Sequence, residues 1–304
     1  MNILKKIIYG QSHKNYRDAI LKNRLESGQP KSANYVGVGH PKGLVDLETE
    51  YYFNNFGYRD TDWRSKTEIL AVGCSNTFGV GVPVEGRWTN ILEKKLNKKI
   101  QNLGITGGSI NDLTSKLFAY FETFGNPEII LFLTPDPFRV KLPFKKDLIK
   151  GKHYDEHDLY LENVCLPYDE SSENLKKSQY FKTPYSYREI LPIEVPLYFS
   201  VQSLYMLDQY CKSNNIKLIL SSWFEDFVQL LNNIEGDRFN NFFPLPSYLI
   251  NTRNVTQDCH ENYKNDFKKY FDNGADIEYG IKYSHSGVHW HVHVAEEFYK
   301  EINK

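Results

Sequence analysis

The fold is decided by the stretch Glu68-Ile69-Leu70-Ala71-Val72-Gly73-Cys74-Ser75-Asn76-Thr77-Phe78-Gly79. From Ile69 it is a continuous apolar run that ends in a glycine, which is the pattern of a strand buried on both faces of a parallel sheet. Glycines then stand on either side of Ser75, and glycine permits a tight turn and a close approach of backbone. The stretch therefore predicts a buried strand followed at once by a sharp turn that carries a serine.

The same strand-then-helix alternation continues along the chain. Further strands are predicted at 100–103, 127–133 and 216–221, and helices at 88–96, 109–124, 197–212, 224–231 and from about 287 to the end. Strands that alternate with helices predict a parallel sheet covered on both faces. We therefore expect an α/β fold, a three-layer α/β/α sandwich with a central parallel sheet.

The domain organisation follows from where this pattern holds. Residues 1–50 lack clear periodicity and are rich in Lys, Asn, Gly and Ser, which indicates an N-terminal arm or partial cap. Residues 51–304 are predicted to form one α/β domain. The polar, tyrosine-rich segment near 140–195 indicates a surface insertion or lid within that domain, and the Pro- and Asn-rich segment at 234–256 indicates a loop.

Composition excludes several classes of protein. The chain has 304 residues, 40% of them hydrophobic, and a net charge of −1, which argues against a main role in binding nucleic acid. The apolar part of the amino terminus is too short for a signal peptide, and no segment approaches the ~20 apolar residues of a membrane helix. We expect a protein that is cytoplasmic or virion-associated, with its four scattered cysteines reduced.

Candidate catalytic groups follow three predicted strands. In an open parallel sheet, functional side chains collect at the carboxyl ends of the strands. Ser75 is a candidate nucleophile in its tight turn, and the alternative is a serine that only caps a helix. The glycine-rich turn at Gly107 offers backbone N–H groups for an oxyanion, and the alternative is a flexible loop before an N-cap at Ser109. Asp136 lies between two prolines, and a salt bridge with Arg139 is its alternative role.

Four of the nine histidines gather near the carboxyl terminus: His285, His289, His291 and His293. Imidazole titrates near neutrality, so a histidine here is a candidate general base for Ser75. His289, His291 and His293 alternate with other residues, and this spacing would also place metal ligands on one face of a strand. Two weaker patterns lack the residues that would complete a site: Cys259-His260 for a structural metal and Gly79-Val80-Gly81 for a phosphate.

Together these motifs resemble those of the SGNH, or GDSL-type, hydrolase superfamily. The family's first block, G-D-S-x-T-x-G, is similar to Gly73–Gly79, and its upstream N-x-x-G-[FY]-R segment is similar to Asn54–Asp60. Its second block is similar to Asn102–Gly107. Its last block, H-[PS]-G followed by a histidine and an alanine at fixed offsets, is similar to His285–Ala295. The G-C-S-x-T-F-G version of the first block is also similar to that of phage-encoded members.

The resemblance implies a flavodoxin-like SGNH hydrolase fold and assigns roles to residues. Ser75 would be the nucleophile and His285 the general base, with His289 as the alternative base. The backbone N–H groups of Ser75 and Gly107 would hold the oxyanion.

Three positions depart from the family pattern. Cys74 stands where the family has aspartate, and Lys282 stands where the family has the triad aspartate, three residues before His285. Asp136 lies nearest to the asparagine that the family uses as an oxyanion donor. An ionised carboxylate accepts hydrogen bonds rather than donating them, so Asp136 cannot replace that asparagine unless it is protonated.

The expected function is that of a serine-dependent carboxylic-ester hydrolase, an esterase or deacetylase acting on a small-molecule or carbohydrate ester. No cofactor and no metal are expected. In the absence of the family acid, a Ser75–His285 dyad would be oriented by a main-chain carbonyl, or by Asp276 or Glu278. The alternative from another class is a non-catalytic structural or binding protein, such as a virion component, that keeps the SGNH fold.

Overall fold

The computed structural model describes a core of regular elements and the turns that join them. The described residues are 8, 35–38, 48–51, 53–79, 82, 84–105, 107–145, 159–165, 194–222, 227–228, 231, 242–244 and 288–304.

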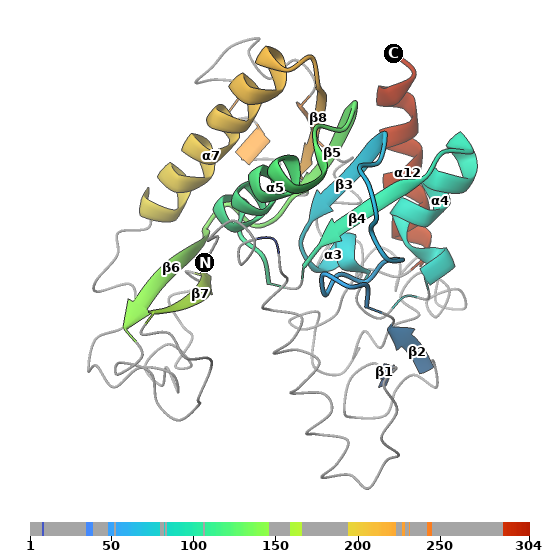
Figure 1. The fold of residues 1–304 in the computed structure, drawn as a ribbon, viewed down its shortest axis with the longest axis horizontal. Helices are drawn as coiled ribbons and strands as arrows, with labels where there is room; N and C mark the ends of the chain where they lie inside the picture. Colours follow the sequence, from blue (N-terminus) through green and yellow to red (C-terminus); the bar gives the residue numbers. More distant parts are fainter. Residues whose placement is uncertain are drawn as a thin grey trace, which may run out of the picture.

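A five-stranded sheet lies at the centre (Figure 1). Its strands are β3 (Ile69–Gly73), β4 (Ile100–Gly104), β5 (Ile129–Thr134), β8 (Lys217–Ser222) and β9 (Phe242–Pro244). Their spatial order is β4-β3-β5-β8-β9, and every neighbouring pair is parallel. Numbered along the chain this order is 2-1-3-4-5, the flavodoxin-like arrangement, which confirms the predicted fold class.

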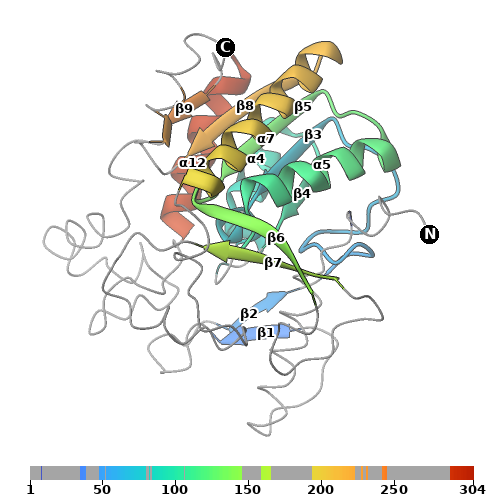
Figure 2. The ribbon, with the colours of Figure 1, turned by 90° about the vertical axis from the view of Figure 1, so that its left-hand side faces the viewer.

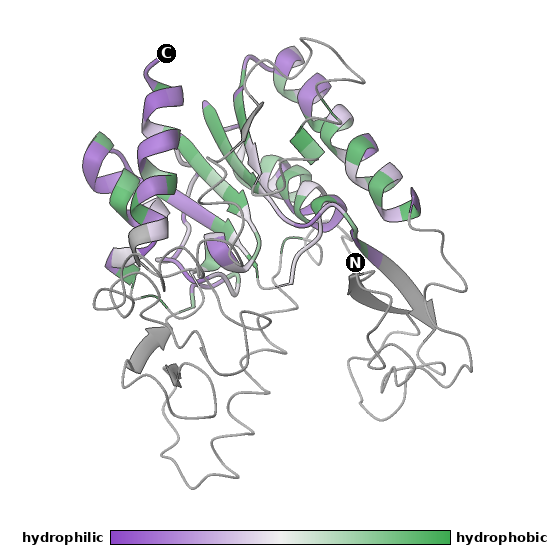
Figure 3. Ribbon diagram, turned by 180° about the vertical axis from the view of Figure 1, so that it is seen from behind, coloured by the Kyte–Doolittle hydropathy of each residue, from purple (hydrophilic) through white to green (hydrophobic). Residues whose placement is uncertain are grey.

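Among the described residues, helices cover both faces of the sheet (Figure 1). On one face lie α5 (Ile110–Phe124) and α7 (Glu194–Ser213), and on the other lie α4 (Trp88–Leu96) and α12 (Val288–Ile302). Successive strand residues point to opposite faces, so Leu70 and Val72 pack under α5 whereas Ile69 and Ala71 pack under α4 and α12. Apolar residues make up most of β3 and β5 between these helices (Figure 3). The three-layer sandwich therefore has two separate cores.

Local signals in the sequence explain where the helices begin and end. Ser109 caps α5, because its Oγ accepts a hydrogen bond from the Asp112 N–H at 3.4 Å, as the capping alternative predicted. Helix α4 ends at Asn97, which adopts a left-handed conformation with φ of 52°. Of the helix predicted at 224–231, residues 227, 228 and 231 are described, and they are helical and buried.

Helix α12 runs antiparallel to the strands. Lys217, the first residue of β8, donates from Nζ to the carbonyls of Glu301 and Ile302, each at 3.0 Å. These carbonyls belong to the last turn of α12, so its carboxyl terminus lies at the amino end of β8. A helix of 15 residues is about 22 Å long, about the length of the strand beside it. The amino terminus of α12 therefore lies at the carboxyl edge of the sheet.

Three pairings were not predicted from the sequence. Strands β1 (Tyr35–Val38) and β2 (Glu48–Tyr51) form an antiparallel pair within the expected arm, and β6 (Arg139–Lys145) and β7 (Leu159–Cys165) form another within the expected insertion. Both pairs lie beyond the carboxyl ends of the central strands (Figures 1 and 2). The segment at 234–256 was interpreted as a loop, but it contributes the fifth strand, β9. The interpretation as a loop was therefore incomplete.

A charged cluster lies within α5 and β6. Lys116 is 2% exposed, and Asp112, one helical turn earlier on the same face, forms an ion pair with Lys141 Nζ at 2.5 Å. Burial is the main reason that the pKa of Lys116 falls from 10.5 to about 8; Asp112 opposes this shift and Lys141 adds to it. Burying an ammonium group costs free energy that neutralisation relieves.

This cluster predicts a pH dependence of stability. Between pH 8 and 10.5 the unfolded chain binds a proton at Lys116 that the folded chain has released, so this group makes the folded protein more stable as pH rises. Lys116→Met removes the effect. The quantity to compare is the free energy of unfolding of Lys116→Met minus that of the wild type. This difference is expected to be about 2–3 kcal/mol lower at pH 10 than at pH 7. Urea titrations at both pH values measure it, and a difference independent of pH would contradict it.

Candidate functional site

Ser75 opens a four-residue helix, α3 (Ser75–Phe78), directly after β3. The Cys74 carbonyl accepts hydrogen bonds from the N–H groups of Thr77 and Phe78, each at 2.9 Å, and the Ser75 carbonyl accepts one from Gly79 at 2.8 Å. Gly79 ends the helix in a left-handed conformation, with φ of 77°. Since an isolated helix of one turn is unstable in water, contacts from other elements must hold α3 in place.

Two glycines let α3 lie directly against the sheet. A Cβ atom on Gly73 would stand 2.1 Å from Thr77 Oγ1 and 2.7 Å from the Leu133 carbonyl oxygen. A Cβ atom on Gly104 would stand 2.4 Å from the Phe78 backbone nitrogen. Gly73 and Gly104 are paired in register on β3 and β4. The helix therefore occupies the space that side chains would fill on the two strands.

A buried arginine holds the carboxyl end of α3. Arg59 is 2% exposed and donates from Nη1 to the carbonyls of Phe78 and Gly79, and from Nη2 to the Val82 carbonyl at 2.8 Å. Its guanidinium also lies over the Phe78 ring, 5.8 Å from the centroid. A cation at the carbonyl end of a helix is favourable because those carbonyls carry partial negative charge.

A second buried arginine supports the first. Arg87 donates from Nη1 to the Arg59 carbonyl and from Nε to Asn90 Oδ1 at 2.9 Å. Burial, followed by repulsion from Arg59, lowers the pKa of Arg87 to about 9, while Asp60 and Glu93 act in the opposite direction. Two buried cations thus fix the loop that follows the serine turn.

Removing the first of these cations should be costly. Arg59→Ala removes the guanidinium that donates to the buried carbonyls of Gly79 and Val82, and it also leaves a cavity. We expect a loss of about 3 kcal/mol or more in the free energy of unfolding, measured by urea titration. The control is Arg64→Ala, because Arg64 is exposed and its loss should cost under ~0.5 kcal/mol. Equal losses in the two variants would show that Arg59 does not hold the turn.

The strand order brings three predicted site residues to one edge. Ser75 follows β3, Gly107 follows β4 and Asp136 follows β5, and β3 is the strand between the other two. In register, Gly73 is opposite both Gly104 and Leu133, so the three loops start at the same level. Ser75 therefore lies in the central loop, as the carboxyl-end rule predicted.

The surroundings of Ser75 leave its polar groups available. The side chain is half-buried, and Cys74 Sγ at 3.6 Å is the hydrogen-bonding partner of Oγ among the described residues. Within the same part of the chain, nothing accepts a hydrogen bond from the Ser75 backbone N–H. Gly107 is exposed, with φ of 69°, and a Cβ atom there would meet nothing within 4 Å. Gly107 thus borders open space, and the Ser75 N–H has no acceptor among the described residues.

Asp136 has a local partner. Its Oδ1 accepts a hydrogen bond from the Phe138 N–H at 2.9 Å, and its carbonyl accepts one from the Arg139 N–H at 3.2 Å. The neighbouring Pro137 carbonyl accepts from Ser200 Oγ on α7 at 2.8 Å. These bonds form a rigid turn between β5 and β6, so the described contacts of the Asp136 carboxylate stabilise the loop itself.

The histidines separate into different roles. His289 belongs to the first turn of α12, at the carboxyl edge of the sheet, whereas His285 and Lys282 lie outside the described residues. His291 is buried, and its Nδ1 accepts a hydrogen bond at 3.3 Å from the N–H of Trp88, the first residue of α4. His291 therefore joins the starts of α12 and α4.

The idea that alternating histidines form metal ligands on a strand is wrong, because residues 288–302 are helical. On a helix, positions two residues apart do not share a face, so positions 289, 291 and 293 do not all lie on one side of α12. Over the residues that the structure describes, no group of three potential ligand side chains is placed to hold a metal ion. None of the described helices is long and apolar enough to cross a membrane.

Several residues that build the site were not singled out as such from the sequence. Arg59, Arg87 and Asn102 are charged or polar yet almost fully buried, and together they hold the serine turn. Arg59 and Asn102 fall inside segments of the resemblance, but their contacts with α3 join residues 19 or more positions apart along the chain. Only the tertiary structure brings these partners together.

No protein-family description matches the chain, and no curated protein matches its sequence. Among solved structures it is similar to a lipolytic protein of the G-D-S-L family from Desulfitobacterium hafniense DCB-2, with 14% identity and a TM-score of 0.41, over 78% of this chain and 99% of that one. It is also similar to a mutant of an acetyl-xylooligosaccharide esterase from Geobacillus Stearmophilus, with 14% identity and a TM-score of 0.42, over 80% of this chain and 96% of that one. A third is an acetyl xylan esterase from the rumen bacterium Butyrivibrio proteoclasticus, with 13% identity and a TM-score of 0.39, over 80% of this chain and 65% of that one. These distant likenesses assign no activity, and the fold assignment rests on the strand order and the two helix layers.

Proposed function

We propose that the protein is a serine-dependent carboxylic-ester hydrolase. Ser75 attacks the ester carbonyl, and a histidine takes the Ser75 proton and then donates it to the leaving alcohol. Water, deprotonated by the same histidine, then attacks the acyl-serine, which releases the carboxylic acid and returns the proton to Ser75. His285 is the leading base and His289 the alternative. The backbone N–H groups of Ser75 and Gly107 stabilise the tetrahedral oxyanion.

One observation carries this proposal: a half-buried serine opens a one-turn helix at the centre of the carboxyl edge, and buried arginine and glycine residues fix that helix. A helix that only needed a capping residue would not require two glycines on adjacent strands and a guanidinium at its end. A nucleophile does require such placement, because its hydroxyl must be held at a defined position and must stay accessible.

For the substrate, we propose an acyl ester of a carbohydrate, with acetyl as the acyl group. The chain is rich in aromatic residues, with 22 Tyr and 19 Phe, and aromatic rings suit a cleft that binds sugars. The β6–β7 and β1–β2 pairs lie beyond the carboxyl edge of the sheet (Figure 2). We propose that they contact the sugar part of the substrate.

The test is hydrolysis of p-nitrophenyl acetate, butyrate and octanoate, together with acetate release from acetylated xylo-oligosaccharides. The proposal predicts turnover above background that depends on Ser75 and favours the acetyl ester. Turnover of every ester that is equal to the buffer rate would reject the enzyme. A preference for octanoate would keep the esterase and reject the acetyl substrate.

A second candidate is a non-catalytic structural or binding protein, such as a virion component of a phage. The observation in its favour is Asp136, whose carboxylate accepts a local hydrogen bond at the position where the related family has an asparagine donor. Cys74 and Lys282 stand at two further family positions that are normally acidic. The absence of any covalent labelling at Ser75 would favour this candidate.

A further inference from the structure

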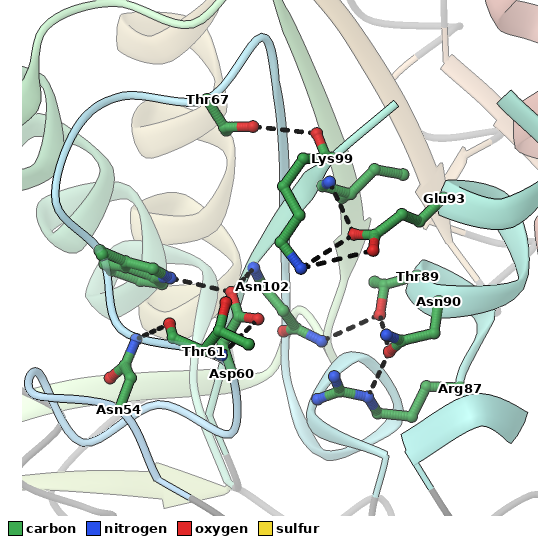
Figure 4. Close-up of polar contacts among 12 residues, drawn as sticks. Asn54, Asp60, Thr61, Thr67, Arg87, Thr89, Asn90, Glu93, Lys99 and Asn102 are labelled. Atoms are coloured by element: carbon green, nitrogen blue, oxygen red, sulfur yellow. Dashed lines mark hydrogen bonds and ion pairs between the residues drawn. The ribbon is translucent and has the colours of Figure 1, made fainter. Parts of the chain in front are cut away.

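Asn102 lies at the point where the serine turn, α4 and the second glycine loop meet. It is a β4 residue, it is 2% exposed, and its side chain is on the face covered by α4 and α12. In Figure 4 it is at the centre of a set of polar contacts that connect residues far apart in sequence. None of the roles assigned above to Ser75, Gly107 or the histidines includes this side chain.

The amide group of Asn102 binds three elements at once. Its Nδ2 donates to the Thr77 carbonyl in α3 at 2.8 Å and to Thr89 Oγ1 in α4 at 3.1 Å. Its Oδ1 accepts from the Gly104 N–H at 2.8 Å, at the start of the loop that leads to Gly107. Both donor hydrogens are used, so this geometry requires an amide and not a carboxylate.

The backbone of Asn102 is fixed as well. Its N–H donates to Asp60 Oδ2 at 2.8 Å, and the same carboxylate oxygen accepts from Trp63 Nε1 at 2.8 Å. Because Asp60 fixes the backbone of Asn102, the Asn102 side chain can restrain the position of α3.

The contacts form a closed circuit around α3. From Asn102 the circuit passes through Thr89 Oγ1 to Asn90 Oδ1, which also accepts from Arg87 Nε. Arg87 then binds the Arg59 carbonyl, and Arg59 returns to the carbonyls at the end of α3. Asn102 and Arg59 thus hold neighbouring carbonyls of the serine helix from two directions.

We propose that Asn102 is a positioning residue for the reaction at Ser75: it fixes the distance between the nucleophile helix and the glycine loop that supplies the oxyanion donor. The inference rests on the proposed hydrolase function. Displacement of a catalytic group by about 1 Å can reduce a rate about 100-fold. Loss of the Thr77 contact should therefore slow the chemical step more than it weakens substrate binding.

The experiment compares Asn102→Asp with Gln101→Glu, two changes of a buried amide to the acid of the same shape in the same strand. Gln101 is 8% exposed, faces the opposite side of the sheet, and binds the Ser65 carbonyl and the Tyr120 hydroxyl. Measurements are made per folded protein, with the folded fraction taken from circular dichroism. They are kcat and KM for p-nitrophenyl acetate and the rate constant for phosphonylation of Ser75 by a fluorophosphonate.

Asn102→Asp is expected to lower kcat and the phosphonylation rate constant about 10- to 100-fold, with KM within about 2-fold. Gln101→Glu is expected to change each within about 2-fold. Equal effects of the two variants, or an effect on KM alone, would overturn the inference. If Asn102→Asp does not fold, Thr89→Val removes one partner of Asn102 and is expected to act in the same direction with a smaller effect; no effect there would also overturn it.

Hydrogen exchange separates failure of this inference from failure of the proposed function. Asn102→Asp loses the Nδ2 donor to the Thr77 carbonyl and keeps the acceptor for the Gly104 N–H. It should therefore speed exchange of the Phe78 and Gly79 amides of the serine helix, and Gln101→Glu should not. If the wild-type protein does not react at Ser75, the hydrolase proposal fails, and selective faster exchange in Asn102→Asp still supports Asn102 as the residue that holds the turn. Unchanged exchange in Asn102→Asp would overturn that role whatever the activity.

Discussion

Replacement of Ser75 with alanine is expected to abolish ester hydrolysis, with a fall in kcat of about 10⁴-fold or more. The reason is that Ser75 carries the proposed nucleophilic hydroxyl, at the start of α3 and at the centre of the carboxyl edge. Stability should change by less than ~0.5 kcal/mol, because the side chain is half-buried and its described contact is a 3.6 Å approach to Cys74 Sγ. Turnover of p-nitrophenyl acetate and the urea midpoint measure the two effects.

The control for this prediction is Ser115→Ala, on the exposed side of α5, which should keep full turnover. His285→Ala and His289→Ala then identify the base: the proposal expects the large loss in His285→Ala. A large loss in His289→Ala alone would transfer the role to the first turn of α12. Full turnover in Ser75→Ala would exclude Ser75 as the nucleophile.

Gly104→Ala is expected to cost about 3 kcal/mol in the free energy of unfolding and to remove activity. The new methyl group would stand 2.4 Å from the Phe78 nitrogen and 2.7 Å from the Thr77 carbonyl carbon, and both atoms belong to the backbone of α3. No rotation of a side chain can relieve these contacts. The serine helix must therefore leave its place on the sheet, or the sheet must distort.

Gly107→Ala provides the contrast, in the loop that follows β4. A methyl group there would meet nothing within 4 Å, and only the positive φ of 69° opposes it. The expected cost is about 1 kcal/mol. Denaturant unfolding of both variants measures the difference. Equal stability of the two variants would mean that the close packing of α3 against Gly104 does not matter.

The sequence was sufficient to predict the architecture because the signals are local and strong. The apolar runs of β3 and β5 are short and end at glycine or proline, which is typical of buried strands, and their alternation with helices predicts the parallel sheet. The position of Ser75 followed from the same rule, since a residue after a buried strand must lie at the carboxyl edge. The cap at Ser109 was also visible, because capping depends on neighbours within one helical turn.

The rest depended on contacts between distant parts of the chain. The fifth strand, β9, pairs in a segment rich in Pro and Asn, where local propensity indicates a loop and only the neighbouring strand β8 provides hydrogen bonds. The buried roles of Arg59 and Asn102 could not be read from residue type, because such residues are mostly exposed and become buried only when carbonyls from other elements satisfy them.

The histidine run shows a different limit. Alternation at 289, 291 and 293 has the period of a strand, but the apolar residues around Trp290, Val294 and Phe298 have the period of a helix and pack against α4. Burial of that face determines the structure, and His291 becomes a partner of the α4 amino terminus rather than a ligand.

The most direct test of the central claim is to map the adduct that a fluorophosphonate forms with the wild-type protein. Tandem mass spectrometry of the digested protein identifies the modified residue. The account predicts one phosphonyl group per chain, attached to Ser75 and absent from Ser75→Ala. The absence of an adduct, or an adduct on another residue that survives Ser75→Ala, would contradict it.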